Sequence, residues 1–169
     1  MPQFNVSSEI NVESIHLDTG NFYKLTVTAA DLIDLAERFG WVSVDALAAE
    51  LRVRKVARDC WDIHGHMTAQ ICQNCVVTGE AVSESIDFQI EERYVRNAEQ
   101  GEDVEVGLDG VEPLKNGAID IGELVVQSLG LAATPWPRVD DAPDSYVIGD
   151  QALDHPFAGL SVLKQQTRK

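Results

Sequence analysis

A strict alternation between apolar and polar residues limits the folds open to this chain more than any other feature. From Trp61 to Ile71, every second residue is apolar or glycine and the residues between them are polar. Successive side chains of a β-strand point to opposite faces, so this period of two indicates a strand with one buried and one wet face. A similar pattern runs from Ile86 to Tyr94, after the turn residues 78–80. We therefore expect two antiparallel strands within residues 51–96, at the centre of a twisted antiparallel sheet.

Other segments have helical or strand signals of their own. Thr28 is a favoured helix N-cap, Asp31 follows three residues later, and Gly40 is a favoured left-handed stop, so we expect a helix between Thr28 and Gly40. Residues 23–28 alternate like a half-buried strand. Residues 43–50 are rich in alanine, and Leu47 and Leu51 are four apart, which favours a short helical turn.

A second helix is expected in residues 119–138. Asp120 and Glu123 can form a reciprocal capping box at its start, and Pro135 cannot continue a helix. Taken together, these elements predict an α+β fold with a twisted antiparallel β-sheet and a few packed helices.

Length and composition indicate one compact domain. The 169 residues are 44% hydrophobic, which is enough to fill one core, so we expect a single domain over residues 1–169. Residues 98–112 are acidic, glycine-bearing and poor in bulky apolar side chains, which favours a mobile loop. Residues 138–154 lack a periodic pattern and are expected to form an extended segment.

No run approaches the roughly 18 apolar residues of a membrane span, and no basic leader precedes an apolar stretch at the start. An odd number of cysteines, three, argues for reduced thiols rather than a disulfide framework. We therefore expect a cytoplasmic protein that does not bind membranes.

Charge is distributed unevenly along the chain. The net charge is −15, and residues 99–154 contain thirteen acidic side chains against two basic ones. Residues 51–58 contain only basic charges, Arg52, Arg54, Lys55 and Arg58. Because affinity for nucleic acid rests on Lys and Arg that displace counterions, these four are the candidate RNA-binding residues. Arg52, Arg54 and Arg58 should share one side of a strand and Lys55 the other, although such charges also protect strand edges from aggregation.

Cys72 and Cys75 have the spacing of half a zinc site. The missing ligands would have to come from His64, His66, Cys60 or another chain. The alternative is that the cysteines are small buried hydrophobic residues and that the histidines are ordinary surface residues. A redox role is not favoured, because the residues after Cys75 look like strand and turn rather than helix.

The chain lacks the usual marks of a nucleophile elbow, a phosphate-binding loop or a dinucleotide fold. We therefore expect a protein that is not an enzyme and has no small-molecule substrate.

Three segments of the chain carry specific motifs. They are the capped helix and proline-rich segment at residues 119–138, the Q-x-C-V-V-T element at residues 73–78, and the H-P-F-A-x-L element at residues 155–160 with Leu163 and Lys164. In these motifs the chain resembles the YceD-like family of bacterial and plastid proteins. The resemblance implies a role in the accumulation of large-subunit (23S) ribosomal RNA, hence in ribosome assembly, without a known enzymatic activity.

Three functional hypotheses follow. The first is a non-enzymatic ribosome assembly factor that contacts large-subunit rRNA. The second is an acidic module that holds a basic large-subunit ribosomal protein, since a strongly negative segment attracts a basic partner. The third is a zinc-binding structural module at Cys72 and Cys75.

Overall fold

The computed structural model describes residues 3–15, 20–96, 111–114 and 116–143. Its elements are β1 (Gln3–Phe4), β2 (Glu9–Asn11), the 3-10 helix η1 (Val12–Ser14), β3 (Asn21–Leu25), α1 (Ala29–Phe39), β4 (Ser43–Ala57), β5 (Cys60–Asn74), β6 (Ala81–Val95), β7 (Val111–Pro113), β8 (Ala118–Asp120) and α2 (Ile121–Ala132).

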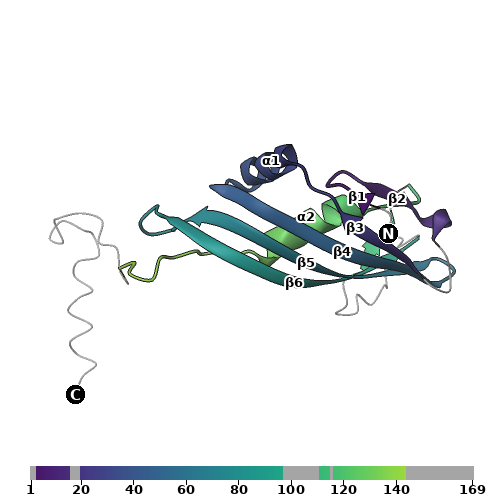
Figure 1. The fold of residues 1–169 in the computed structure, drawn as a ribbon. Coiled ribbons are helices and arrows are strands. Elements are labelled where there is room, and N and C mark those ends of the chain that lie inside the picture. Colours follow the sequence, from purple (N-terminus) through teal and green to yellow (C-terminus); the bar gives the residue numbers. More distant parts are fainter. Residues whose placement is uncertain (1–2, 16–19, 97–110, 115, 144–169) are drawn as a thin grey trace, which may run out of the picture. The chain divides into compact units, whose positions relative to one another are not determined.

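The main sheet has six strands in the order β1-β3-β4-β5-β6-β7 (Figure 1). The strands from β3 to β6 pair antiparallel, and only the short outer strands β1 and β7 pair parallel. A separate two-stranded ladder joins β2 to β8. The α+β fold with a mostly antiparallel sheet is therefore confirmed.

Two long hairpins form the centre of this sheet. β4, β5 and β6 are each fifteen residues long, and β5 pairs with β6 from Cys60↔Val95 to Asn74↔Ala81. The apolar face of β5 faces the core, where Trp61, Ile63 and Met67 are fully buried. The alternating pattern thus correctly predicted both the pairing across the 78–80 turn and the buried face.

The helical turn expected at residues 43–50 is wrong, because this segment is the first half of β4. It pairs with β5 from Ser43↔Cys72 to Glu50↔His66, with a register shift between Val44 and Ala46. The spacing of Leu47 and Leu51 fits a strand as well as a helix, because residues four apart lie on the same face of either element. Pairing with a long central strand outweighs the helix propensity of alanine, which amounts to tenths of a kcal/mol per residue.

Both helices begin where their caps predict. Thr28 and Asp31 form a capping box at the start of α1, and Gly40 ends it with φ 67°. Asp120 accepts the backbone N–H of Glu123 at 2.8 Å, and α2 ends at Ala132, before Pro135. The reciprocal hydrogen bond expected from the Asp120 backbone to the Glu123 side chain is wrong. The Glu123 carboxylate instead accepts hydrogen bonds from both terminal nitrogens of Arg38, at 2.8 and 2.6 Å.

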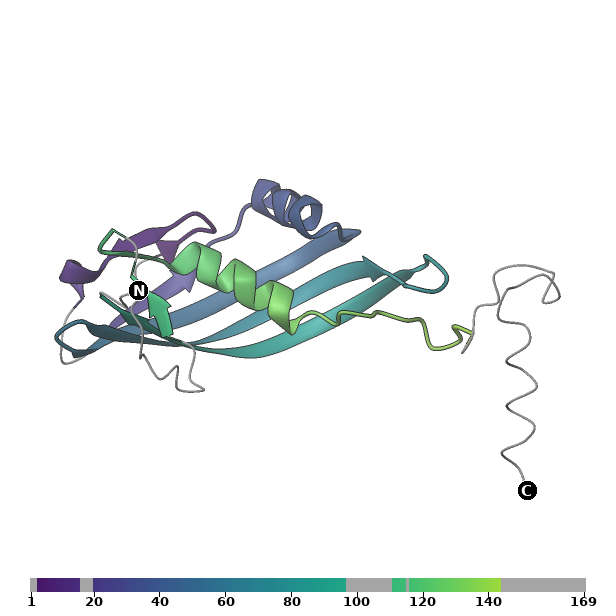
Figure 2. The same ribbon diagram turned by 180° about the vertical axis from the view of Figure 1, so that it is seen from behind.

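Among the described residues, the two helices lie over one face of the main sheet and no helix packs on the other. α2 crosses one face and packs against β5 and β6, and α1 packs on β4 (Figure 2). Seven of the twelve residues of α2 are buried, Gly122 and Ser128 among them. We call the opposite side of β3–β6 the outer face; its side chains alternate with the buried ones and are exposed, apart from a few such as Asp62.

Contacts divide the chain into one unit, Met1–Val139, and a second, Asp140–Lys169, of which only residues 140–143 are described. A single domain therefore stays a prediction. Residues 98–110 and 144–154 lie outside the described residues, and residues 138–143 contain no helix or strand. The loop expected to reach Glu112 ends earlier, because Val111 and Glu112 pair with Arg93 and Tyr94 of β6.

Within the described part of the chain, no helix is both long and apolar enough to cross a membrane.

Candidate functional site

Basic side chains gather on the outer face near the β4–β5 turn. Arg52 and Arg54 are both exposed there, because their neighbours Leu51 and Val53 fill the core. Arg52 lies opposite Phe22 of β3 and His64 of β5. The Arg52 guanidinium carbon stands 5.3 Å from the centre of the Phe22 ring, within the range of a cation–π contact.

The neighbouring row contains a tight ion pair. Arg54 lies opposite Asp62, which in turn lies opposite Arg93 of β6. The Arg93 Nε and a terminal nitrogen donate to the two Asp62 carboxylate oxygens at 2.7 and 3.0 Å. These hydrogen bonds from Arg93 lower the pKa of Asp62 despite its burial, and Arg54 contributes in the same direction. Asp62 therefore stays ionised and holds the Arg93 guanidinium through two hydrogen bonds.

The other two candidate cations lie elsewhere. Lys55 points to the core side as expected, with its Nζ 5.3 Å from the centre of the Trp61 ring. The prediction that Arg58 continues the line of Arg52 and Arg54 is wrong. A register shift between Lys55 and Ala57 interrupts the alternation, and Arg58 lies in the turn between β4 and β5. The structure therefore places two of the four candidates side by side on the outer face.

Several other cations form ion pairs with carboxylates. Lys24 pairs with Glu50 at 3.1 Å, and Arg96 pairs with Asp59 at 3.4 Å and with Glu13. Arg38 and Arg93 are paired as described above. Arg52 and Arg54 are both exposed and stand two residues apart on the same face of β4, which makes them candidates for contact with an external anion.

The two cysteines lie at the other end of β5. Cys72 and Cys75 are both buried, which agrees with the alternative interpretation of this motif. Cys75 lies in the turn after β5, where its Sγ accepts the Thr78 backbone N–H at 3.4 Å. Hydrogen bonds from Thr78 lower the pKa of the Cys75 thiol to about 6.

The proposed additional zinc ligands are far from this turn. With a rise of about 3.3 Å per strand residue, His66 lies roughly 20 Å from Cys72 along β5, and His64 and Cys60 lie still further away. They cannot complete a tetrahedral site with Cys72. Within residues 3–15, 20–96, 111–114 and 116–143, no three His, Cys, Asp or Glu side chains are placed so that they could hold a metal ion together. Zinc binding stays a prediction that would need ligands from elsewhere.

The segment after α2 is fastened to the same end of the hairpin. Glu84 of β6 accepts hydrogen bonds from the Thr134 backbone and hydroxyl, and from Gln73. The Val76 N–H donates to the Pro137 carbonyl at 2.9 Å. The Q-x-C-V-V-T and proline-rich segments, separated by more than 50 residues, thus form one structural unit.

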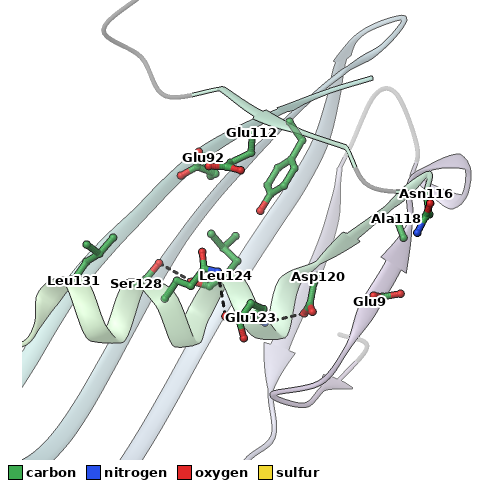
Figure 3. A pocket seen from close by; sticks show the side chains of 12 residues that line it. Glu9, Glu92, Glu112, Asn116, Ala118, Asp120, Glu123, Leu124, Ser128 and Leu131 are labelled. Atoms are coloured by element: carbon green, nitrogen blue, oxygen red, sulfur yellow. Dashed lines mark hydrogen bonds between the residues drawn. The ribbon is translucent and has the colours of Figure 1, made fainter. Parts of the chain in front are cut away.

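An acidic cleft of about 390 Å³ lies between α2 and the β6–β7 edge (Figure 3). Its carboxylates are Glu9, Glu92, Glu112, Asp120 and Glu123, and its apolar lining includes Leu124 and Leu131. Burial, followed by repulsion from Glu112, raises the pKa of Glu92. Burial and nearby carboxylates, Glu92 foremost, raise the pKa of Tyr94 to about 12. Sequence analysis missed this cleft because β2, β6, β7, β8 and α2, which are far apart in the sequence, form it together.

The family model described as "Large ribosomal RNA subunit accumulation protein YceD" matches residues 63–164, more than half of the chain. The chain belongs to the YceD family. No curated protein and no solved structure matches it.

The YceD match covers the cysteine turn, the segment fastened to it and most of the cleft. It begins at Ile63, so Arg52, Arg54, Lys55 and Arg58 lie outside the stretch matched to YceD. About 45 Å of strand separates the cysteine turn from the β4–β5 turn near those cations.

Proposed function

We propose that this chain supports the accumulation of large-subunit ribosomal RNA as a non-enzymatic assembly factor that contacts the RNA directly. The match to the YceD family over more than half of the chain carries this proposal. The exposed cations Arg52 and Arg54 on the outer face of the sheet provide the contact surface.

Charge limits how this contact can work. A chain with net charge −15 is repelled by RNA on average, so it cannot coat RNA through charge alone. A few cations concentrated at one end of the outer face can still anchor one RNA feature. The rest of the acidic surface then points away from the RNA.

The test is to purify the full chain from its own cells at low salt and to sequence the RNA that accompanies it. We expect enrichment of large-subunit rRNA, and loss of that RNA when Arg52→Ala and Arg54→Ala are combined. The matched control combines Lys115→Ala and Arg138→Ala, which removes the same charge outside β3–β6 and should retain the RNA. Equal RNA recovery with all three proteins would refute a contact through the outer face.

The acidic cleft favours a second candidate function, in which the chain holds a basic large-subunit ribosomal protein. Five carboxylates line the cleft, and burial followed by repulsion from Glu112 raises the pKa of Glu92, a repulsion that a bound cation would relieve. Combined Glu92→Gln and Glu112→Gln should then release such a protein in pulldowns. Asp34→Asn with Glu37→Gln on α1 is the control. Unchanged capture by the cleft variant would exclude this candidate.

A further inference from the structure

The row of side chains on the outer face that contains Arg52 also contains two flat rings. Phe22, Arg52 and His64 are register partners on β3, β4 and β5, and all three are exposed. Neighbouring strands lie about 4.8 Å apart, so these side chains stand next to one another on one surface. Sequence analysis did not single out Phe22.

Phe22 is exposed on a strand whose other face is well buried in the core. Its neighbour Tyr23 is buried, whereas Phe22 is 44% exposed on the solvent side of the same strand. The Arg52 guanidinium lies over its ring at 5.3 Å, which keeps a cation beside the aromatic surface. Aromatic rings and guanidinium planes are the groups on which unstacked bases of single-stranded RNA stack.

We infer that the row Phe22, Arg52 and His64 is a stacking platform for single-stranded RNA, with Arg54 positioned for an adjacent phosphate. This inference rests on the proposed function, because it names the kind of RNA and the surface that binds it. From β3 to β5 the platform spans about 10 Å, which suits about two or three bases.

The charges around the platform determine on which side of it the phosphates of a bound RNA strand would lie. Arg54 and Arg93 stand in the next row toward the β4–β5 turn, and Arg93 is neutralised by Asp62. Glu91 is the register partner of His64 on β6, and its negative charge would repel a phosphate there. Beyond the row of Lys24 and Glu50, the described outer-face residues toward the other end include Asp87 and no lysine or arginine. The phosphates should therefore lie toward the β4–β5 turn.

A duplex fits this surface poorly. Proteins that bind double-stranded RNA contact phosphates and 2′-hydroxyls along many base pairs, since paired bases cannot stack on a protein ring. Two or three cations cannot supply those contacts against the overall negative charge. A single strand gains stacking energy that does not depend on charge, and each stacked base is worth on the order of tenfold in affinity.

The experiment measures fluorescence anisotropy of labelled ten-nucleotide RNA, either single-stranded with mixed sequence or in a ten-base-pair duplex, with the full chain at low salt. We expect the single strand to bind at least tenfold more tightly than the duplex. Phe22→Leu should weaken single-strand binding about tenfold, and His64→Ala should weaken it in the same direction. Trp136 is another exposed aromatic residue, 74% exposed, and Trp136→Leu should leave binding unchanged. Thermal unfolding of each variant checks that the fold is kept.

Two results overturn the inference in different ways. If Phe22→Leu and His64→Ala bind like the wild type while the Arg52 and Arg54 variant is weakened, the RNA contact stands and the stacking platform is wrong. Tighter binding of the duplex leads to the same conclusion. If the wild type binds neither RNA but captures a basic ribosomal protein, both the platform and the proposed RNA contact are wrong.

Discussion

At the scale of single residues, the Asp62–Arg93 pair shows how the outer face keeps its charges in place. Asp62 is 7% exposed and accepts two hydrogen bonds from Arg93. Because its pKa is lowered in the folded state, the pair stabilises the fold above the ordinary carboxyl pKa of about 4. This stabilisation is lost as the pH falls through the lower folded pKa.

We predict that Asp62→Asn lowers the free energy of unfolding at pH 7 by about 1–2 kcal/mol, because Arg93 loses its charged acceptor. The difference between variant and wild type should shrink as the pH falls below about 4. Urea unfolding at several pH values measures this. Asp87→Asn, whose partner His66 and own side chain are both exposed, is the control and should have little effect. A pH-independent difference would contradict the role given to the pair.

The Cys75 thiol provides a second prediction at this scale. Thr78 is the main cause of its low pKa, about 6, so Thr78→Val should raise that pKa toward the usual thiol value of about 8.5. The remaining Thr78 backbone N–H keeps part of the effect. A thiolate absorbance titration of the Cys60→Ser, Cys72→Ser background, with Thr68→Val as control, follows the change. An unaltered titration would show that the turn does not set the ionisation of Cys75.

At the scale of elements, regular patterns were predictable and local interruptions were not. The period of two in residues 61–71 predicted β5, its buried face and its pairing with β6. The alanine-rich segment 43–50 was misassigned because its strand character depends on the partner β5, which local propensity does not include. Arg58 was misplaced because the register shift before Ala57 leaves no mark in the sequence.

Part of the candidate site could have been found from the sequence. The strand expected from Tyr23 begins two residues earlier, at Asn21. Alternation from this start places Phe22 with Lys24 on the polar side, which is the signal for an exposed aromatic residue. That Phe22 lies beside Arg52 depends on the β3–β4 register, which no local pattern specifies.

The start of α2 offers a prediction about packing. A Cβ at Gly122 would stand 2.5–2.6 Å from backbone atoms of Asn5 and Val6, which cannot move aside without shifting the chain. We therefore expect Gly122→Ala to destabilise the protein by about 1–3 kcal/mol, although alanine favours helix. Thermal unfolding measures the loss. Gly130→Ala meets the Phe39 side chain instead of backbone, so it should cost less; the reverse order would contradict this packing.

At the scale of the whole molecule, the account depends on few cations in a strongly acidic chain. Each phosphate contact with a single strand contributes a slope of about −0.7 to the dependence of log affinity on log salt. Two contacts through Arg52 and Arg54, or three with Arg58 of the adjacent turn, predict a slope between about −1.4 and −2.1. A salt titration of RNA binding measures it. A slope several times steeper would mean that many more cations take part than the outer face presents.

The central claim is that the outer face touches RNA, and ultraviolet crosslinking in living cells tests it most directly. The full chain would be crosslinked to RNA, digested, and its RNA-bearing peptides located by mass spectrometry. We predict crosslinks within β3, β4 and the first half of β5, with Phe22 and His64 among the modified residues. Crosslinks confined to other parts of the chain, or a complete lack of RNA-bearing peptides, would contradict the claim.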